Sequence, residues 1–496
     1  MKITFRADAS ESIGSGHLMR CLALAQECRS QGHSCLFITS DKTSVLNRRL
    51  RDEGFAVTEL ARIYPDTQDL EVTNDVLREN PDAWLVLDGY HFDTKYQAAC
   101  KETGNPLLVV DDNAIWDHYN SDIVLNQNIH AGSLVYSSES YTRFLLGTRY
   151  MLLRNEYKKW QGWKRTIAPK AKKLLVSMGG ADQNNTTATV IDALELIKRS
   201  DFEVRVVIGS NNVHSDKIHQ KAAIAGKSIY VYQNVADMSE HMAWADLAVS
   251  AGGVTSYEMA YMALPNIMIV LADNQLSNAE RLGSQGAAVN LGWYADISID
   301  FLASQIAELM DDVDRRSEMS SKGRELVDGE GTSRVIMAIT GARIRLRTVR
   351  PDDCRLVWEW ANEPAVREMS FSSQAIPWEG HQRWFEKRQN NPQSMMWIGV
   401  DSEDKPLGLV RYDIEDNARA IVGVSVDINH RGAGIASALL KNSLTRLFND
   451  TDVGMIDAFI KPNNIGSIKA FSNAGYSIIG KTVVESQEAL CYRICK

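Results

Sequence analysis

The sequence has little of what marks secreted and membrane-spanning proteins. It has seven cysteines in 496 residues, an odd number that cannot all pair within one chain, and none of them forms a CxxC spacing. Such usage indicates reduced thiols rather than a disulfide framework. The longest apolar runs, such as Ile267–Ala272, are far too short to cross a bilayer, and the first residues hold no apolar signal core. We therefore expect a cytoplasmic protein without a membrane partner.

An excess of positive charge is also missing. The 54 lysines and arginines face 63 aspartates and glutamates, for a net charge of -9. This balance argues against nucleic acid as the main partner. An anionic substrate must then be held by local features such as helix N-termini and single arginines. There is no HExxH motif and no paired-aspartate cluster, so the sequence predicts a site that works without a metal.

What the sequence does have is length and regular alternation. A single hydrophobic core stops growing at about 250–300 residues, so this length predicts roughly three domains. Short apolar runs alternate with helical patterns in two series, which predicts two parallel sheets with helices on both faces. The expected strands are Ile3–Phe5, Cys35–Thr39, Trp84–Leu87, Leu107–Val110 and Ile123–Leu125, then Leu174–Ser177, Val204–Ile208, Ile229–Tyr232, Leu247–Val249 and Ile267–Leu271.

The two series are separated by a basic stretch at Lys158–Lys173, which we interpret as a linker. From about Ala342 the chain becomes rich in tryptophan, and two segments, Met396–Val400 and Leu407–Tyr412, indicate antiparallel strands. The predicted fold class is α/β, with two Rossmann-like domains followed by an α/β domain with a mixed sheet. The predicted domains are 1–157, 172–340 and 342–496.

The first chemical motif is GSGHLMR. Its glycines, Gly14 and Gly16, lie between a predicted strand and the helix His17–Arg29, where they leave the first helical N–H groups open to an anion. His17 starts this helix, and Arg20 lies one turn further on the same face. Both the helix start and Arg20 disfavour the imidazolium form, and a neutral histidine suits general-base work. The alternative is a histidine that only caps or packs.

Two further glycine-containing turns follow strands of the second series. MGGADQNNTT places Gly180 before a helix, with Asn184 or Asn185 near its cap. The other turn, SAGGVTSYEMA, opens a helix with glycines and hydroxyls that suit a pyrophosphate and with a carboxylate that suits ribose hydroxyls. The residues concerned are Gly253, Thr255, Ser256 and Glu258. A capping box that only stabilises the helix is the alternative.

The next strand ends in Asp273, Asn274 and Gln275, with Asn278 at the head of the following helix. Ligands of parallel sheets bind at the carboxyl ends of strands. Uncharged amides at this place suit the hydroxyl and acetamido groups of a sugar.

The third motif, VSVDINHRGAGIASALL, is the most specific signal in the chain. A predicted strand, Ile421–Ile428, leads into a run of small residues before an amphipathic helix, and their backbone amides can surround a pyrophosphate. The run consists of Arg431, Gly432, Ala433, Gly434, Ile435 and Ala436. Downstream, IKPNNIGSIKAFSNAGY adds a strand, Asn464, Ser467, a helix and then Gly475 and Tyr476.

Residues 1–340 resemble the glycosyltransferase-B architecture and, more narrowly, the UDP-sugar hydrolases of pseudaminic acid biosynthesis. The resemblance rests on GxGHxxR, GGxTSxE, the strand ending in NQ, DGYH at Asp88–His91 and FLLGTRYMLLRNEY at Phe144–Tyr157. It implies water attack at C1 of a UDP-linked diacetamido sugar, with His17 as the base. It also implies that Tyr90 and Asn274 line the sugar pocket. Arg154, Gln275, Glu258 and the Gly252–Ser256 turn would bind the rest of the substrate.

Residues 342–496 resemble the GCN5-related N-acetyltransferases, through the R-x-x-G-x-G/A pattern and the segment after it. The resemblance implies acetyl-CoA as co-substrate, bound by the Arg431–Ala436 run, Asn464 and Ser467. Val424 and Val426 would bond its pantetheine and thioester from a splayed strand.

The usual tyrosine acid of that family is Phe471 here, so Tyr476 or Ser467 would serve, or the thiolate leaves without an assigned acid. Glu363, His381 and Trp384 would form the acceptor pocket, or else they are surface charge and core aromatics.

Together the resemblances imply a bifunctional enzyme. The C-terminal domain would acetylate the 4-amino group of a UDP-4-amino-4,6-dideoxy-N-acetyl-L-altrosamine, and the N-terminal part would hydrolyse the product to the free sugar and UDP. The alternatives are a glycosyltransferase with an acceptor other than water, the same activities on another diamino sugar, and a sensor that binds both ligands without turnover. The sequence does not indicate an oligomeric state.

Overall fold

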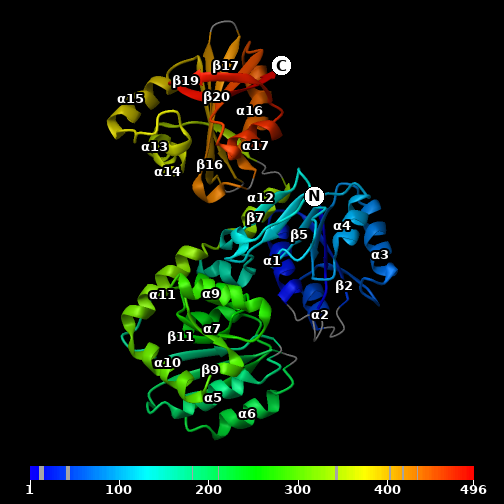
Figure 1. Ribbon diagram of the computed structural model, residues 1–496, viewed down its shortest axis with the longest axis vertical. Helices are drawn as coiled ribbons and strands as arrows, with labels where there is room; N and C mark the ends of the chain where they lie inside the picture. The colour runs from blue at the N-terminus through cyan, green and yellow to red at the C-terminus, as the bar shows by residue number, and fades with distance from the viewer. Residues whose placement is uncertain are drawn as a thin grey trace. The chain divides into compact units, whose positions relative to one another are not determined.

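The computed structural model describes residues 1–9, 16–40, 45–180, 182–209, 212–340, 344–401, 404–415, 418–432 and 434–496. Gly14 and Ala433, which the sequence analysis placed in ligand sites, lie outside these residues. The chain divides into two compact units, Met1–Ile336 and Met337–Lys496. The described residues form three sheets, two in the first unit and one in the second (Figure 1).

The first sheet is parallel throughout, with the strand order β3-β2-β1-β4-β5-β6-β7. Its central strands, such as β5 with the sequence LLVV, are buried on both faces, which explains their continuous apolar runs. The strands are β1 Lys2–Ala7, β2 Ser34–Thr39, β3 Ala56–Glu59, β4 Trp84–Asp88, β5 Leu107–Val110, β6 Ile123–Asn126 and β7 Arg143–Leu146. The helices are α1 Gly16–Ser30, α2 Val45–Asp52, α3 Thr67–Arg78 and α4 Thr94–Lys101.

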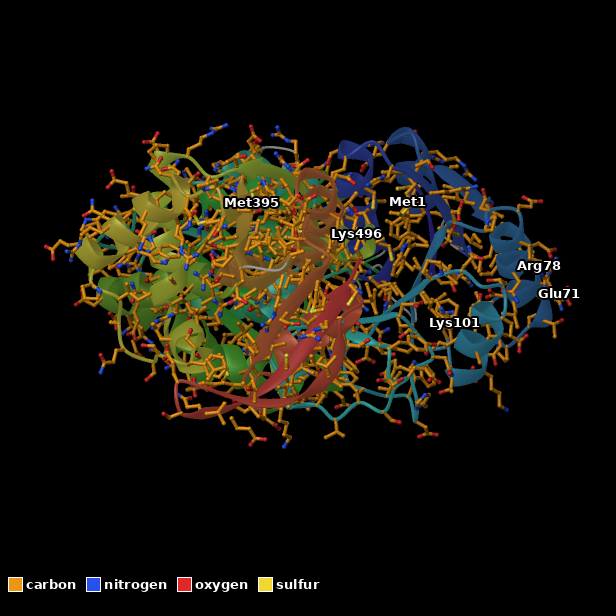
Figure 2. All side chains as sticks on the ribbon, turned by 90° about the horizontal axis from the view of Figure 1, so that it is seen from above. Met1, Glu71, Arg78, Lys101, Met395 and Lys496 are labelled. Atoms are coloured by element: carbon orange, nitrogen blue, oxygen red, sulfur yellow. The ribbon has the colours of Figure 1, made fainter. Side chains whose placement is uncertain are left out.

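Helix α3 illustrates how these helices cover the sheet. Asp66 caps its first turn by accepting a hydrogen bond from the backbone N–H of Gln68, and Leu77 is buried against the sheet core. Glu71 and Arg78, labelled in Figure 2, lie on the exposed side of the same helix. The face toward the sheet therefore combines Leu77 with the buried polar residues Asp69, Thr73 and Asn74, while the outer face is charged.

The second sheet is also parallel, with the order β10-β9-β8-β11-β12-β13. Its strands are β8 Lys173–Ser177, β9 Glu203–Ile208, β10 Ser228–Gln233, β11 Leu247–Ala251, β12 Asn266–Val270 and β13 Val289–Trp293. Its helices are α5 Thr186–Leu196, α6 Ser215–Ile224, α7 Met238–Trp244, α8 Thr255–Tyr261, α9 Leu276–Ser284, α10 Ile299–Asp311 and α11 Val313–Leu326, followed by α12 Gly331–Thr340. In both sheets the chain order reverses beside the first strand, at β1/β4 and at β8/β11, and ligands of such folds bind at that reversal.

The third sheet is mixed, with the order β14-β15-β16-β17-β18-β20-β19. Only β17 and β18 pair in parallel, and the other neighbours are antiparallel. Its strands are β14 Arg345–Thr348, β15 Ser394–Val400, β16 Pro406–Glu415, β17 Arg419–Val426, β18 Met455–Ile460, β19 Ser477–Val484 and β20 Gln487–Cys495. Its helices are α13 Cys354–Asn362, α14 Pro364–Met369, α15 Trp378–Gln389, α16 Ile435–Asp450 and α17 Ile465–Asn473.

The predicted fold class is confirmed: two parallel α/β sheets are followed by a mixed sheet. The reading of Lys158–Lys173 as a plain linker is wrong. Trp160 and Trp163 pack against the core of the second sheet, and Arg165 donates to backbone carbonyls of Met242 and Met262. The packing of the two tryptophans, rather than the charge of the lysines, therefore determines the structure of this segment. The predicted bounds of three separate domains remain a prediction.

No helix in the described part of the chain is both long and apolar enough to span a membrane.

Candidate active sites

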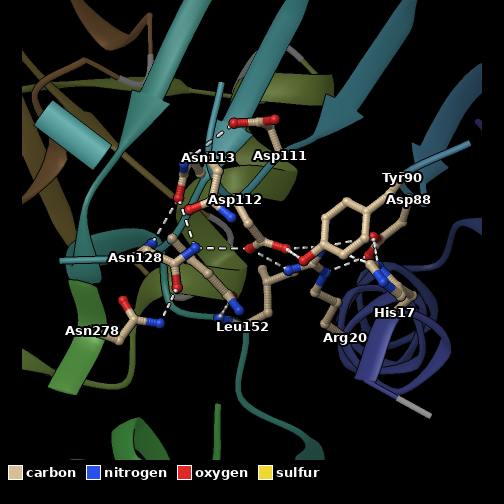
Figure 3. Close-up of polar contacts among 12 residues, drawn as sticks. His17, Arg20, Asp88, Tyr90, Asp111, Asp112, Asn113, Asn128, Leu152 and Asn278 are labelled. Carbon is tan, nitrogen blue, oxygen red and sulfur yellow. Dashed lines mark hydrogen bonds and ion pairs between the residues drawn. The ribbon is translucent and has the colours of Figure 1, made fainter. Parts of the chain in front are cut away.

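The first candidate site lies at the carboxyl edge of the first sheet. Asp88 ends β4 and stands opposite Ala7 at the end of β1, next to the first turn of α1. From that turn His17 directs Nδ1 at Asp88, with Nδ1 and Oδ1 2.6 Å apart (Figure 3). Both side chains are buried. A histidine held in this way donates its Nδ1–H to the carboxylate and keeps Nε2 free to accept a proton.

Arg20 ties this pair to a second carboxylate. Its Nε donates to Oδ2 of Asp88 at 2.5 Å, its Nη2 donates to Oδ1 of Asp88 at 2.6 Å, and its Nη1 donates to Oδ1 of Asp112 at 2.8 Å. Burial alone would raise the pKa of Asp88, but the charges of Arg20 and His17 outweigh it and lower the pKa. The pKa of Asp112 is lowered by Arg20 against the same effect of burial. Both carboxylates are therefore ionised and paired.

Arg20 lies beside His17, as the sequence predicts, and it also has carboxylate partners that the sequence does not indicate. The sequence analysis expected the helix start and Arg20 to keep His17 neutral. In the structure Arg20 does lie against His17, with Nη2 and Nδ1 3.2 Å apart, but its charge is balanced by Asp88 and Asp112. Asp88 stabilises the positive charge that the ring gains when it takes a proton.

Tyr90 and Asn274 meet at the same place. The hydroxyl of Tyr90 donates to Oδ2 of Asp112 at 2.7 Å, and its ring stands edge-on to the ring of His17, with the centroids 4.8 Å apart. The side chain of Asn274, from the second sheet, approaches the same hydroxyl. Tyr90 is 43% exposed, so part of its ring remains open to a ligand. Gly16 precedes His17 with free space around its Cα.

A chain of buried amides joins this site to helix α9 of the second sheet. Asn128 donates to Oδ1 of Asp112 at 2.7 Å, and Asn278 donates to Oδ1 of Asn128 at 3.1 Å (Figure 3). Tyr257 of α8 donates to Asn278 at 2.7 Å. The position of α8 and α9 therefore bears directly on the carboxylate that holds Arg20.

The turn between β11 and α8 holds the residues predicted to bind a nucleotide. Gln275 packs over it, since a Cβ at Gly252 would lie 3.3 Å from the Cβ of Gln275 and one at Gly253 would lie 3.8 Å from its Nε2. Ser256 donates its hydroxyl to the carbonyl of Gly253 at 2.6 Å, so that hydroxyl is engaged. Thr255 begins α8 and is half-buried.

Glu258 is not free in the way the sequence suggested. Its Oε1 accepts a hydrogen bond from Nη2 of Arg154 at 3.0 Å, and Arg154 also pairs with Glu156 at 3.1 Å. Burial would lower the pKa of Arg154, but Glu258 and its neighbours raise it. The structure thus brings together two predicted binding residues, Arg154 and Glu258, from segments 104 residues apart.

The helix start after β8 differs from the prediction. Asn185 occupies the cap position in a left-handed conformation without a side-chain cap bond. Asp182 accepts instead from the N–H groups of Thr186 and Thr187, at 2.8 and 3.0 Å. A carboxylate of the chain therefore holds the place expected for a ligand's anion. Gly180 packs tightly against Gly209. A Cβ added to Gly209 would come 2.3 Å from the carbonyl oxygen of Gly180.

The second candidate site lies in the mixed sheet. Pairing of β17 with β18 ends at Ile421 and Asp457, although β17 continues to Val426. Val424 and Val426 therefore lie where the two strands part, as the sequence predicted, although the strand begins and ends two residues earlier than expected.

The glycine-containing run after β17 ends at a helix start without a side-chain cap. Gly432 and Gly434 have φ of 81° and 79°, a region that glycine adopts without strain. Gly434 caps α16, which begins at Ile435 and continues through Ala436, and its first turn carries no acidic residue. Such a helix start can receive a phosphate.

Several predicted residues of this domain have structural partners. Glu363 caps α14 and accepts from Nη2 of Arg431 at 2.6 Å. His381 is buried and bonds the carbonyl of Cys354, so its reading as an acceptor-pocket residue is wrong and the core reading holds. Asn464 caps α17 by accepting from the N–H of Ser467 at 3.1 Å.

Tyr476, predicted as the acid for the departing thiolate, lies in the core of the mixed sheet. Its ring stands edge-on to Phe471 at 5.0 Å. Burial, together with the neighbouring hydroxyl of Tyr412, raises the pKa of Tyr476. Ser467, the other candidate, is half-buried at the start of α17.

Sequence reasoning missed the carboxylates that organise the first site. Asp88 was noted only as part of DGYH, and Asp112 and Asn128 were not noted at all. A second pair, His91 Nε2 and Asp8 Oδ2 at 2.9 Å, was missed as well. The signal was present, because Asp8, Asp88 and Asp112 all lie at or just after the carboxyl ends of parallel strands, where ligands bind.

Two parts of the chain match known domain families. Residues 174–331 match the glycosyltransferase family 28 C-terminal domain, and residues 343–477 match the acetyltransferase (GNAT) domain. The chain is a fusion of these two enzyme domain types. Among described residues, no group of three or more His, Cys, Asp or Glu side chains could hold a metal ion.

Three similar proteins place the fusion in context. The uncharacterized protein MJ1062 of Methanocaldococcus jannaschii is 23% identical over 500 residues, which is 96% of each chain. The UDP-2,4-diacetamido-2,4,6-trideoxy-beta-L-altropyranose hydrolase of Campylobacter jejuni is 27% identical over 296 residues, 58% of this chain and 98% of the hydrolase. The crystal structure of Acinetobacter baumannii MurG aligns with a TM-score of 0.49 at 17% identity, covering 68% of this chain and 99% of MurG.

Arg20 allows a test of the charge network. Replacing it in Arg20→Leu leaves Asp88 and Asp112 buried without their cation, which we expect to cost about 3–5 kcal/mol of unfolding free energy near neutral pH. Arg78→Leu, which removes an exposed partner of Asp75, should cost at most about 1 kcal/mol. Urea denaturation of the full chain measures both.

The loss of unfolding free energy in Arg20→Leu should depend on pH in a direction set by the two pKa shifts. The lowered pKa values of Asp88 and Asp112 mean that their stabilisation is present above the ordinary carboxyl pKa of about 3.9 and is lost as pH falls through the folded values. In Arg20→Leu these pKa values rise, so the deficit relative to wild type should shrink as pH falls from about 7 to about 4. A deficit that is constant with pH would contradict the network.

Proposed function

We propose that the chain is a bifunctional enzyme of pseudaminic acid biosynthesis. Its C-terminal domain transfers acetyl from acetyl-CoA to the 4-amino group of UDP-4-amino-4,6-dideoxy-N-acetyl-beta-L-altrosamine. Its N-terminal part hydrolyses the resulting UDP-2,4-diacetamido-2,4,6-trideoxy-beta-L-altropyranose to the free sugar and UDP. The observation that carries this proposal is the buried His17–Asp88 pair. It is supported by the 27% identity of the chain to a hydrolase of that same substrate over 98% of the hydrolase's length.

In the hydrolysis step His17 Nε2 takes a proton from water as the water oxygen bonds to C1 of the sugar. The bond from C1 to the UDP oxygen breaks, and its electron pair leaves with UDP. Asp88 stabilises the imidazolium formed and fixes the ring orientation. The transition state has oxocarbenium character, and UDP needs little protonation to leave, so one base suffices.

The residues around His17 would orient the sugar and the nucleotide. Tyr90, held by Asp112, and Asn274 offer a hydroxyl and an amide at one point, which suits an acetamido group. The turn containing Gly253, Thr255 and Ser256, together with Gln275, would hold UDP. Glu258 and Arg154, Arg20 beside His17, and the backbone at Gly14, Gly16 and Gly180 complete the proposed substrate contacts.

In the acetylation step the amine nitrogen attacks the thioester carbonyl, the carbon–sulfur bond breaks, and coenzyme A leaves as the thiolate, while the nitrogen loses one proton to solvent water. Val424 and Val426 would bond pantetheine and the thioester oxygen where β17 parts from β18. The Arg431–Ala436 run and the α16 start would hold the pyrophosphate, with Asn464 and Ser467 beside them. Tyr476 is the proposed source of the proton that the thiolate takes up.

A second candidate is a glycosyltransferase that uses the same nucleotide sugar with an acceptor other than water. The match of residues 174–331 to a glycosyltransferase domain favours it. The two functions differ in a simple observable. The hydrolase releases UDP from the diacetamido UDP-sugar with water alone, whereas the transferase needs an added acceptor.

The proposal is tested by supplying acetyl-CoA and the UDP-4-amino sugar to the purified chain and following products by mass spectrometry. We expect free coenzyme A first, then free diacetamido sugar and UDP. Coenzyme A release without UDP release would favour the transferase. Tight binding of both ligands without products would indicate a sensor and contradict the proposal.

Two variants separate the hydrolytic site. His17→Ala removes the base, and Asp88→Asn keeps a hydrogen-bonding group but loses the charge and the tautomer control. We expect UDP release to fall by about 10²–10⁴-fold in both, with acetyl transfer unchanged. Asp75→Asn, on the exposed side of α3, should change neither rate. If acetylation falls together with hydrolysis, the two sites are not independent.

Gly434 provides the reverse test. Gly434→Val forces a branched side chain into a left-handed conformation at the α16 start, which should abolish acetyl transfer by distorting the pyrophosphate loop. Hydrolysis of substrate that is already acetylated should continue at the wild-type rate. Gly454→Val, at a glycine with open space and no positive φ, is the matched control. Retained acetylation in Gly434→Val would remove this loop from the proposed site.

A further inference from the structure

Arg411 is a half-buried arginine of the mixed sheet. It lies in the middle of β16, directly opposite Gly423 of β17. A Cβ added to Gly423 would come 2.9 Å from Nε of Arg411 and 3.4 Å from its Cγ. The absence of a side chain at this position therefore lets the arginine lie flat against the backbone of β17.

Within the described residues, no hydrogen bond or ion pair involves the guanidinium of Arg411. Arg6, Arg20 and Arg154 are each paired with carboxylates. The neighbour that Arg411 does have is the ring of Trp384, whose centroid lies 5.4 Å from its Cζ. The face of an aromatic ring attracts a cation. It accepts no hydrogen bond from the five N–H groups, which point outward in the plane of the guanidinium.

A second cation increases the imbalance. Arg388, at the end of α15, pairs with Asp413 two residues along β16 from Arg411. Burial lowers the pKa of Arg411, and the charge of Arg388 lowers it further. Arg388 thus has a carboxylate partner in Asp413, whereas Arg411 has none among the described residues. A half-buried guanidinium that has no carboxylate partner among the described residues keeps its N–H groups available to an anionic ligand.

The side of the sheet on which Arg411 lies is significant. Val410 and Tyr412 pack with Leu439 and Leu440 of α16, so they face one side. Arg411 alternates with them and faces the other side with Trp384 and helices α13 and α15 (Figure 1). Arg411 is therefore on the opposite side of the sheet from the α16 helix start.

Arg411 is also close to the point where β17 leaves β18. Gly423 immediately precedes Val424, and β17 has no pairing with β18 beyond Ile421. At about 3.3 Å per residue, Val424 and Val426 lie roughly 3–10 Å along the strand from Gly423. This is a span comparable to one sugar ring with its linkage.

We propose that Arg411, with Arg388 beside it, binds the diphosphate of a nucleotide-sugar acceptor in the acetyltransferase domain. This deepens the proposed function and rests on it for the identity of the sugar. A guanidinium fork matches phosphate oxygens, and its bonds to them are charge-assisted. An acceptor anchored in this way extends its sugar amine toward the parted strands, where the thioester is expected. The domain then selects nucleotide-linked amino sugars over free ones.

Titration calorimetry of the full chain with UDP tests the site without relying on catalysis. We expect two UDP molecules per wild-type chain, one in each unit, and one in Arg411→Gln. Arg446→Gln is the matched control, because Arg446 also lies over a tryptophan of this sheet, at 5.2 Å from Trp397, yet is exposed at the surface. It should still bind two. One UDP in wild type, or two in Arg411→Gln, overturns the proposal.

Steady-state acetylation gives a second readout. In Arg411→Gln the KM for the UDP-amino sugar should rise by about 10–100-fold, with the KM for acetyl-CoA unchanged and the weak acetylation of the sugar without UDP unaffected. Arg411→Lys, which keeps the charge but not the fork, should fall between the two. An equal loss toward the nucleotide-linked and free sugars would mean a structural role and would overturn the proposal.

The two proposals fail separately. If the chain acetylates no amino sugar but Arg411→Gln still loses one UDP, the anion site stands and the proposed reaction fails. If Arg411→Gln does not fold, Arg388→Gln tests the same pair, and an unchanged UDP count and KM in that folded variant would overturn the shared site. Inorganic pyrophosphate that competes with UDP only at the second site would place the recognition in the diphosphate, and failure to compete there would overturn that assignment.

Discussion

A carboxylate removed from water must be paired, and in this protein the pairing of Asp88 determines the geometry of the first site. Asp88 is fully buried between His17 and Arg20, and Arg20 in turn reaches Asp112. Each group satisfies the others, so none can move without exposing an uncompensated charge. This constraint fixes the imidazole of His17 in one orientation.

The same network extends beyond the first sheet. Asp112 accepts from Tyr90 and from Asn128, and Asn128 is held by Asn278 of the second sheet. A shift of α9 would therefore change the hydrogen bonding of Asp112, the carboxylate that holds Arg20. The chemistry proposed for His17 and the binding proposed for the second sheet are linked through buried polar groups, which tolerate few alternative arrangements.

The two units differ in how their charged groups are paired. In the first unit, buried side chains of opposite charge pair with one another, and one basic nitrogen, Nε2 of His17, remains available. In the second, backbone N–H groups at the α16 start and a guanidinium on β16 are left without carboxylate partners, so that charge is available to a ligand. A nucleotide sugar carries groups suited to both places, a diphosphate and a reactive sugar, which gives a chemical reason for joining such domains in one chain.

Much of the fold could be predicted because it depends on local periodicity. Continuous apolar runs such as Leu107–Val110 and Leu174–Ser177 predict buried parallel strands, and the structure has strands there. The place of Val424 and Val426 at parting strands came from the resemblance to the acetyltransferases, not from periodicity. The Lys158–Lys173 segment was misread because its composition is basic, while its tryptophans pack into a core that only the folded chain provides.

The sequence by itself determined the strand and helix succession, the glycine turns and the residues His17, Glu258 and Gly434 that stand at them. Only the tertiary structure decided which charges meet. It placed Asp88 and Asp112 around Arg20, joined Arg154 to Glu258, closed the α5 start with Asp182 and left Arg411 without a carboxylate. The reason is that turn chemistry acts over a few residues, whereas ion pairs form between side chains that sheet pairing brings together from distant parts of the chain.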